Sequence, residues 1–157
     1  MGETSERLYG WGYQGQSIAD LLSFAMASNI EVVVDVRLNP MSRKKGFSKR
    51  ALNEALAAAH LIYLHRPALG NPRDNREAFA SPGTTGGRAA HERFREEVLA
   101  STDGDEAIRE LVLLLTTSPV ALLCWLLGLA VGVVARRWAG CGCEWSRSPR
   151  IWSDQAS

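Results

Sequence analysis

Cysteine is scarce in this chain, and its few copies lie near one end. The 157-residue sequence holds only Cys124, Cys141 and Cys143. An odd number gathered at one end does not make the disulfide framework of a small secreted protein, so free thiols in a reducing compartment are expected. The first seventeen residues contain no apolar core flanked by basic residues, which argues against a secretory signal. We therefore expect a cytoplasmic protein.

Several signatures of familiar chemistry are also missing. No spacing of Cys, His or acidic residues matches a metal site, and neither a nucleophile elbow nor a P-loop occurs. We therefore expect no metal and no cofactor. The pattern Gly10-x-Gly12-x-x-Gly15 matches the dinucleotide fingerprint. That fingerprint needs an acidic partner about twenty residues on, and Asp35 at that place is followed by Arg37, so the match is weak.

The net charge of the chain does not indicate a polyanionic partner. The formal net charge is +1, and the first 124 residues carry fourteen Lys or Arg against fifteen Asp or Glu. A chain of this length fits one domain and can bury a real core. Any binding site must therefore be sought in local clusters of side chains.

Apolar patterns in the first 124 residues alternate between strand and helix. A run of β-branched residues around Val33 is typical of a strand buried on both faces of a parallel sheet. We predict an α/β domain with a small, mostly parallel sheet of about four strands flanked by helices, three-layered and Rossmann-like. The expected strands are Leu8–Tyr13, Ile30–Val36, Leu61–Leu64 and Pro119–Cys124, with helices after Ser17, after Ser48, at His91–Leu99 and after a cap at Asp103 or Asp105.

This order of elements predicts where a ligand would bind. In parallel sheets, ligands lie outside the carboxyl ends of the strands. Three segments should meet there: Gly12–Ser17, Arg37–Lys49 and His65–Arg76. The stretch from His65 to Arg88 is rich in Gly, Pro, Asn and Arg and is expected to be a long loop, which usually carries function or disorder.

The stretch Arg37–Arg50, called here the basic segment, holds six basic residues and no acidic one. It leads into a predicted helix at Ser48, and helix N-termini favour anions through their free N–H groups and dipole. Side chains of Arg and Lys, with the hydroxyls of Ser42 and Ser48, would complete a phosphate-type site. The alternative is a set of solvated charges on a surface loop.

Two residues near the ends of strands are candidates for acid–base chemistry. Asp35 and Arg37 stand two apart on a strand and face the same way, so they could pair. Asp35 could instead be a general base or a metal ligand, and His65 an acid–base group or an ordinary loop histidine. The candidate catalytic residues are Asp35 and His65, and the candidate substrate-binding residues are Gly12, Tyr13, Arg37, Ser42, Arg43, Ser48 and Lys49.

Four blocks of the sequence match a family pattern. They are Tyr9–Ser17, Val34–Lys49 with its Asp-Val-Arg…Pro…Ser-Arg signature, Tyr63–Asn71 ending near Leu-Gly, and Val120–Trp125. Over about residues 8 to 125 the chain resembles the bacterial and archaeal family of domain of unknown function 488. The resemblance implies a compact α/β domain with its motifs at one edge and implies no particular activity. The motif positions it carries over are Gly12, Tyr13, Asp35, Arg37, Pro40, Ser42, Arg43, Leu69 and Gly70.

The chain departs from this pattern after its fourth predicted strand. Family members typically continue with a Glu and a Cys-His-Arg motif, whereas here Leu126 follows Trp125 and no Cys-His-Arg occurs. We interpret residues 1–125 as one α/β domain and residues 126–157 as an atypical tail, frameshifted or disordered. The rival interpretation is a membrane anchor, because Val120 to Ala135 carries no charge and Arg136 follows, but that run is short for a span of about 20 residues.

Three functions remain open from the sequence. The first is an enzyme acting on a phosphate-bearing or nucleic-acid substrate, with Asp35 or His65 doing the acid–base work. The second is a non-catalytic module that binds nucleic acid or a phosphorylated ligand through the same residues. The third, less favoured, is a membrane-anchored domain. The oligomeric state is not predicted.

Overall fold

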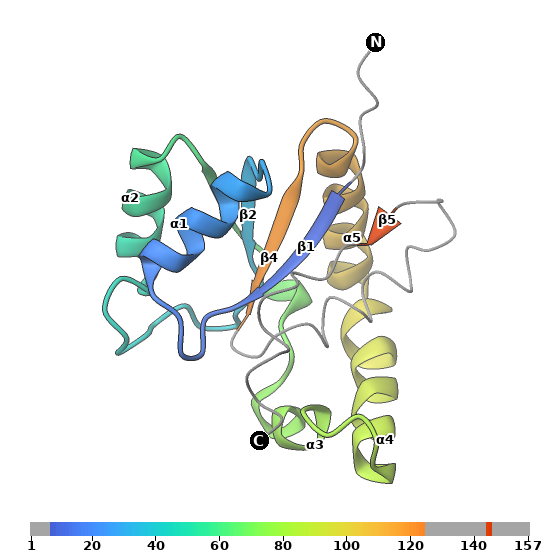
Figure 1. The fold of residues 1–157 in the computed structure, drawn as a ribbon. Coiled ribbons are helices and arrows are strands. Elements are labelled where there is room, and N and C mark those ends of the chain that lie inside the picture. The colour runs from blue at the N-terminus through green and yellow to red at the C-terminus, as the bar shows by residue number, and fades with distance from the viewer. Residues whose placement is uncertain (1–6, 125–143, 146–157) are drawn as a thin grey trace.

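The sheet is parallel throughout and has strand order β3-β2-β4-β1-β5 (Figure 1). The computed structural model describes residues 7–124 and 144–145. Strand β4 lies between β1 and β2, so the first and fourth strands along the chain are neighbours in the sheet. The strands are β1 (Arg7–Gly12), β2 (Val32–Asp35), β3 (Ile62–His65), β4 (Val120–Cys124) and the two-residue β5 (Glu144–Trp145).

Helices connect the strands and cover both faces of the sheet. The α-helices are α1 (Ile18–Ala27), α2 (Lys49–Ala58), α3 (Arg76–Phe79), α4 (Thr85–Arg93) and α5 (Thr102–Leu115). Two short 3-10 helices, η1 (Pro67–Leu69) and η2 (Arg73–Asn75), precede α3, and a π-helical segment, η3 (Phe94–Leu99), follows α4. In Figure 1, α1 and α2 lie to one side of the strands and α5 to the other. The predicted three-layer α/β fold is therefore confirmed.

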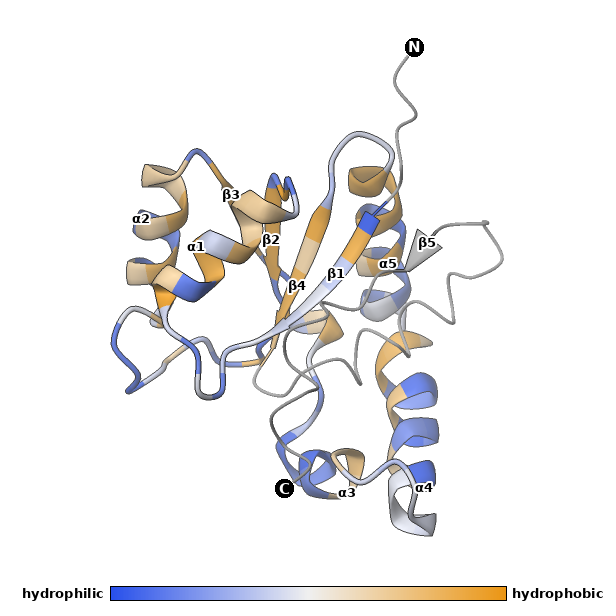
Figure 2. Cartoon of the chain, in the orientation of Figure 1, coloured by the Kyte–Doolittle hydropathy of each residue, from blue (hydrophilic) through white to orange (hydrophobic). Residues whose placement is uncertain are grey.

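Alternation along the strands divides the core into two clusters, one on each face of the sheet. On β2, Val33 faces the cluster that contains Leu21 of α1 and Leu52 of α2. Its neighbours along the strand belong to the other cluster, which contains Leu111 of α5. Strands β2 and β4 are accordingly apolar along most of their length (Figure 2), as expected for strands buried on both sides.

The first two predicted helix starts are correct. Ser17 and Asp20 form a reciprocal capping box at α1, and the Ser48 hydroxyl caps α2 by accepting from the Ala51 amide. The predicted cap of α5 is wrong, because Ser101 rather than Asp103 or Asp105 occupies that position. The Ser101 Oγ accepts from the Gly104 amide at 3.0 Å and donates to the Val98 carbonyl at 2.6 Å, which ties the cap to the preceding turn.

The predicted loop from His65 to Arg88 is also wrong, because much of it is helical. It holds η1, η2 and α3, and α4 begins at Thr85, before the expected start at His91. The start of α4 could not be predicted from the sequence because Gly86 and Gly87 lie in its first turn and glycine is a poor helix former. Gly87 is required by packing, since a Cβ there would lie 1.7 Å from the Ser81 carbonyl oxygen.

The atypical tail predicted from Leu126 onward lies outside the described residues, except for the backbone of Glu144 and Trp145, which extends the sheet beside β1. The uncharged run proposed as a membrane anchor begins with β4, which is a strand in the centre of the sheet. In the part of the chain that the structure describes, no helix has the length and apolar character needed to cross a bilayer.

Two leucines on α5 test the two-sided core. Leu111 is 3% exposed and packs against the sheet, whereas Leu113 on the same helix is 69% exposed. Leu111→Ala should lower the free energy of unfolding by about 2–5 kcal/mol through lost burial and a residual cavity. Leu113→Ala should change it by less than about 0.5 kcal/mol. Urea denaturation of both variants measures this, and equal losses would contradict the assigned face of α5.

Candidate functional site

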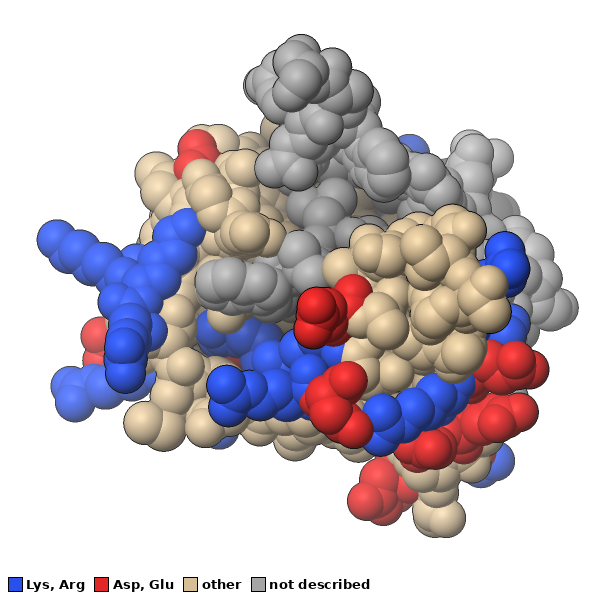
Figure 3. All heavy atoms as spheres, turned by 90° about the horizontal axis from the view of Figure 1, so that it is seen from below, with Lys and Arg blue, Asp and Glu red and all other residues tan. Residues whose placement is uncertain are grey.

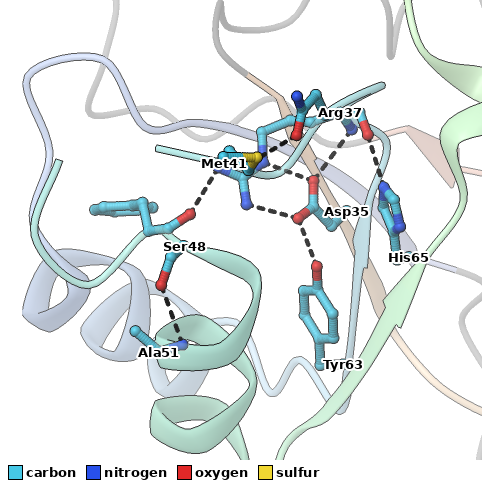
Figure 4. Close-up of polar contacts among 9 residues, drawn as sticks. Asp35, Arg37, Met41, Ser48, Ala51, Tyr63 and His65 are labelled. Atoms are coloured by element: carbon cyan, nitrogen blue, oxygen red, sulfur yellow. Dashed lines mark hydrogen bonds and ion pairs between the residues drawn. The ribbon is translucent and has the colours of Figure 1, made fainter. Parts of the chain in front are cut away.

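The three segments predicted to share one edge of the sheet do meet there. The Lys44 Nζ donates to the carbonyl of Tyr13 at 2.8 Å, which joins the basic segment to the turn after β1. The His65 Nε2 donates to the carbonyl of Arg37 at 2.7 Å, which joins the end of β3 to the same segment (Figure 4). The parallel register sets Asp35 directly beside His65 on neighbouring strands, so this meeting follows from the strand pairing.

At the centre of this edge, Asp35 and Arg37 form a bidentate ion pair (Figure 4). The Arg37 Nε lies 2.8 Å from Oδ1 of Asp35, and its Nη2 lies 2.7 Å from Oδ2. Both side chains are buried, with exposed fractions of 6% for Arg37 and 0% for Asp35. Of the roles that the sequence left open for Asp35, the ion pair with Arg37 is therefore the one present in the structure.

Further hydrogen bonds from within the chain surround this pair. The Arg37 amide donates to Oδ1 of Asp35 at 3.1 Å, and the Tyr63 hydroxyl donates to Oδ2 at 2.7 Å. The carboxylate thus accepts four hydrogen bonds, which matches its number of lone pairs. The Arg37 Nη1 donates to the carbonyl of Phe47 at 2.9 Å, so the guanidinium holds both ends of the loop that precedes α2.

The pKa values of two side chains reflect this arrangement. Burial works against the charge of Arg37, but the hydrogen bonds and charge of Asp35 outweigh it, and the pKa of Arg37 lies above its ordinary value. Burial raises the pKa of Tyr63 above its ordinary value, and the hydrogen bond to the Asp35 carboxylate raises it further, because both disfavour the phenolate. Tyr63 therefore stays a hydrogen-bond donor through neutral pH.

Two aromatic rings, those of Tyr13 and Phe47, pack beside the ion pair. The Tyr13 and Phe47 rings stack with their centroids 5.0 Å apart. The Arg37 guanidinium carbon lies 5.0 Å from the Tyr13 ring centroid, and the Lys44 Nζ lies 5.3 Å from that of Phe47. Each of the two stacked rings thus has a cation over it, an arrangement favoured by the quadrupole of the ring. Tyr13 is only 7% exposed, so its ring is buried beside the guanidinium.

The outer side chains of the basic segment are different in character. Arg43, Lys45 and Lys49 are exposed, and among the described residues they have no acidic partner within ion-pair distance. Figure 3 views the edge toward which the strands point, and a group of Lys and Arg side chains projects at its left, over the loop before α2.

The backbone at the start of α2 contributes less than the sequence suggests. The Lys49 amide donates to the Pro40 carbonyl at 3.1 Å, and the Ala51 amide donates to the Ser48 hydroxyl at 3.3 Å. Ser42 is half-buried, and its hydroxyl accepts from the Lys44 amide at 3.1 Å. Since these groups are already paired inside the chain, an anion here would be held chiefly by side chains.

Three further residues lie at or near this edge. Gly12 is the buried last residue of β1, in register with Cys124 of β4. Gly70 lies so close to the basic segment that a Cβ there would be 2.7 Å from the Val36 carbonyl oxygen, so a larger residue would push the segment away. Arg66 pairs with Glu110 of α5 and also donates to the carbonyl of His65, which anchors the end of β3.

Sequence reasoning missed Tyr63 and Phe47 as parts of this centre. The sequence could have indicated Tyr63, because it precedes His65 by two residues and the two side chains therefore point to the same face of β3. Phe47 contributes its backbone oxygen and its ring, neither of which a pattern of charged residues reveals. No group of three or more His, Cys, Asp or Glu that could hold a metal ion occurs within residues 7–124.

Comparison with known proteins gives one match. A family model described as "Domain of unknown function DUF488" matches residues 17–126, well over half of the chain. That range contains β2, β3 and β4 and the whole basic segment. No curated protein and no solved structure matches the chain.

The ion pair at the centre predicts a large loss of stability on removal of one partner. Asp35→Asn leaves the buried guanidinium of Arg37 without its counter-charge, and breaking such a pair costs about 3–5 kcal/mol. Chemical denaturation followed by circular dichroism measures the loss. Glu54→Gln is the matched control, because it breaks the exposed pair with Arg50 and should leave the unfolding midpoint unchanged. Equal shifts would contradict the structural importance of the buried pair.

The raised pKa of Tyr63 predicts a dependence of stability on alkaline pH. Above the ordinary tyrosine pKa of about 10, the unfolded state loses the proton that the folded state still holds, so stability falls as pH rises. The advantage of the wild type over Tyr63→Phe should therefore be constant below about pH 9 and narrow above about pH 10. Urea titrations at a series of pH values measure it, with Tyr9→Phe as the control. A constant difference at all pH values would show that Tyr63 is not buried against Asp35.

Proposed function

Since the chain belongs to the DUF488 family, a domain of unknown function, its activity must be inferred from its own side chains, and we propose that it binds a phosphate-bearing ligand through the basic segment. The observation that carries this proposal is the contrast within that segment. Arg37 is buried and bound to Asp35, whereas Arg43, Lys45 and Lys49 are exposed without acidic partners among the described residues. Such an arrangement separates the residue that shapes the site from the residues that meet the ligand.

In this proposal Arg37 and Asp35 position the loop and do not touch the ligand. The guanidinium of Arg37 already donates to Asp35 and to the Phe47 carbonyl, and its side chain is 6% exposed. Like charges close together repel one another, and Arg43, Lys45 and Lys49 belong to one short segment, so a loop held in place is needed to present them together. The buried ion pair of Asp35 and Arg37 holds the two ends of this loop together, because Arg37 also donates to the Phe47 carbonyl.

A binding module fits this geometry better than an enzyme that uses Asp35 as a base. A general base must reach the proton that it removes, and all four lone-pair positions of the Asp35 carboxylate accept hydrogen bonds from Arg37 and Tyr63. The catalytic role predicted for Asp35 stays a prediction. A catalytic function would instead depend on His65, which is half-buried at the same edge and uses Nε2 to hold the Arg37 carbonyl.

Binding of inorganic polyphosphate at increasing salt tests the proposal. Each phosphate contact adds about 0.7–0.9 to the slope of log affinity against log salt concentration, as measured for nucleic acids. The double variant Arg43→Gln/Lys45→Gln should therefore bind more weakly and lower that slope by about 1.5. Isothermal titration calorimetry over about 50–200 mM salt measures both quantities.

The matched control removes two exposed arginines from another surface. Arg88 of α4 and Arg95 of η3 are exposed and lie outside the basic segment, so Arg88→Gln/Arg95→Gln makes the same change in net charge. This control should bind polyphosphate as the wild type does. Equal weakening in both double variants would show that net charge alone drives binding and would overturn the proposed site.

A further inference from the structure

We propose that the phosphate-bearing ligand of the basic segment is single-stranded nucleic acid, whose bases contact two exposed apolar side chains, Met41 and Leu38. This inference rests on the proposed function and adds the class of ligand. Of the large hydrophobic side chains that are exposed in the described part of the chain, Met41 is the most exposed at 84%, and Leu38 is 43% exposed. Both lie within the basic segment, between Arg37 and Arg43.

The position of these two side chains is set by the loop. The Met41 amide donates to Oδ1 of Asn39 at 3.2 Å, a local turn that fixes the backbone of Met41 (Figure 4). Leu38 packs on the backbone of Gly70, where a Cβ would lie 2.8 Å from Cγ of Leu38. Because the backbone is held and the side chains face solvent, a ligand would bury them at little cost in conformational order.

Their chemistry fits a ligand in which charge and flat apolar surface alternate. A nucleic-acid strand presents a phosphate and a base at every nucleotide, so cations and apolar side chains side by side match its repeat. The polarizable thioether of methionine makes favourable contacts with aromatic rings. Free phosphate would use the cations alone and would leave Met41 exposed. In a duplex the faces of the bases are stacked on one another, so an unpaired strand is the better match.

An anionic membrane is the other surface that combines charge with apolar material, and the structure favours it less. Helices that lie in a membrane interface carry a broad apolar face opposite a basic one. On α2, the exposed side chains include Asn53 and Glu54 after the basic first turn. The apolar residues Leu52 and Leu56 of this helix are buried in the core, so α2 offers a membrane no apolar face, and nucleic acid is the occupant that we assign.

The test compares two exposed methionines and two ligands. Met26 on α1 is 76% exposed and lies outside the basic segment, so Met26→Ser is the matched control for Met41→Ser. Fluorescence anisotropy with a labelled oligothymidylate of about ten nucleotides reports binding of a base-bearing strand. Met41→Ser should weaken that binding about fivefold, the effect of losing part of the burial of one methionine. Met26→Ser should have no effect, and polyphosphate affinity should be unchanged in both variants.

The outcomes separate this inference from the proposed function. If Met41→Ser leaves oligothymidylate affinity unchanged while polyphosphate still binds, the anion site stands and the nucleic-acid assignment is wrong. If neither ligand binds the wild type, the proposed function itself fails. Tighter binding to vesicles of anionic phospholipid than to the oligonucleotide, or equal binding of a duplex of the same length, would also overturn the assignment to an unpaired strand.

Discussion

The buried ion pair between Asp35 and Arg37 is the constraint on which the candidate site depends. A charge taken out of water is costly unless it is paired and fully hydrogen-bonded, and here the carboxylate receives four hydrogen bonds. One of the donors, Tyr63, comes from the neighbouring strand, and the guanidinium also reaches the carbonyl of Phe47 at the far end of the loop. The pair thus joins β2, β3 and the start of α2, and removing either partner would leave a buried charge unpaired.

This constraint gives opposite roles to basic residues that look equivalent in the sequence. Arg37 shapes the loop from inside, and Lys44 ties it to the turn after β1 while lying over the Phe47 ring. The cations further out, Arg43, Lys45 and Lys49, are exposed, and the proposed function assigns the ligand to them. The proposed function therefore depends on burial more than on the count of charges, since a charge that is already neutralised inside the fold attracts nothing from solution.

Local signals in the sequence were informative where short-range physics dominates. A run of β-branched residues located β2, and short apolar runs located the other main strands. Hydroxyl side chains at Ser17 and Ser48 located helix starts, because a cap is decided within three residues of the chain. The errors came where packing overrides propensity. Gly87 sits inside α4 because the Ser81 carbonyl leaves no room for a Cβ, and no local rule foresees that contact. The cap of α5 was misplaced because several polar residues competed for it, and a hydrogen bond to Val98 favours Ser101.

By itself the sequence determined the alternation of strands and helices, the parallel sheet and the edge at which the three loop segments meet, because these follow from hydrophobic period and chain order. It also set Asp35 and Arg37 two residues apart at the end of a strand, where they could pair. Only the tertiary structure decided that the two neutralise each other and that Tyr63 and Phe47 complete the cluster, since those partners are far apart in the chain. Whether a charged side chain serves the fold or a ligand depends on its burial and its partners, and both are properties of the folded chain.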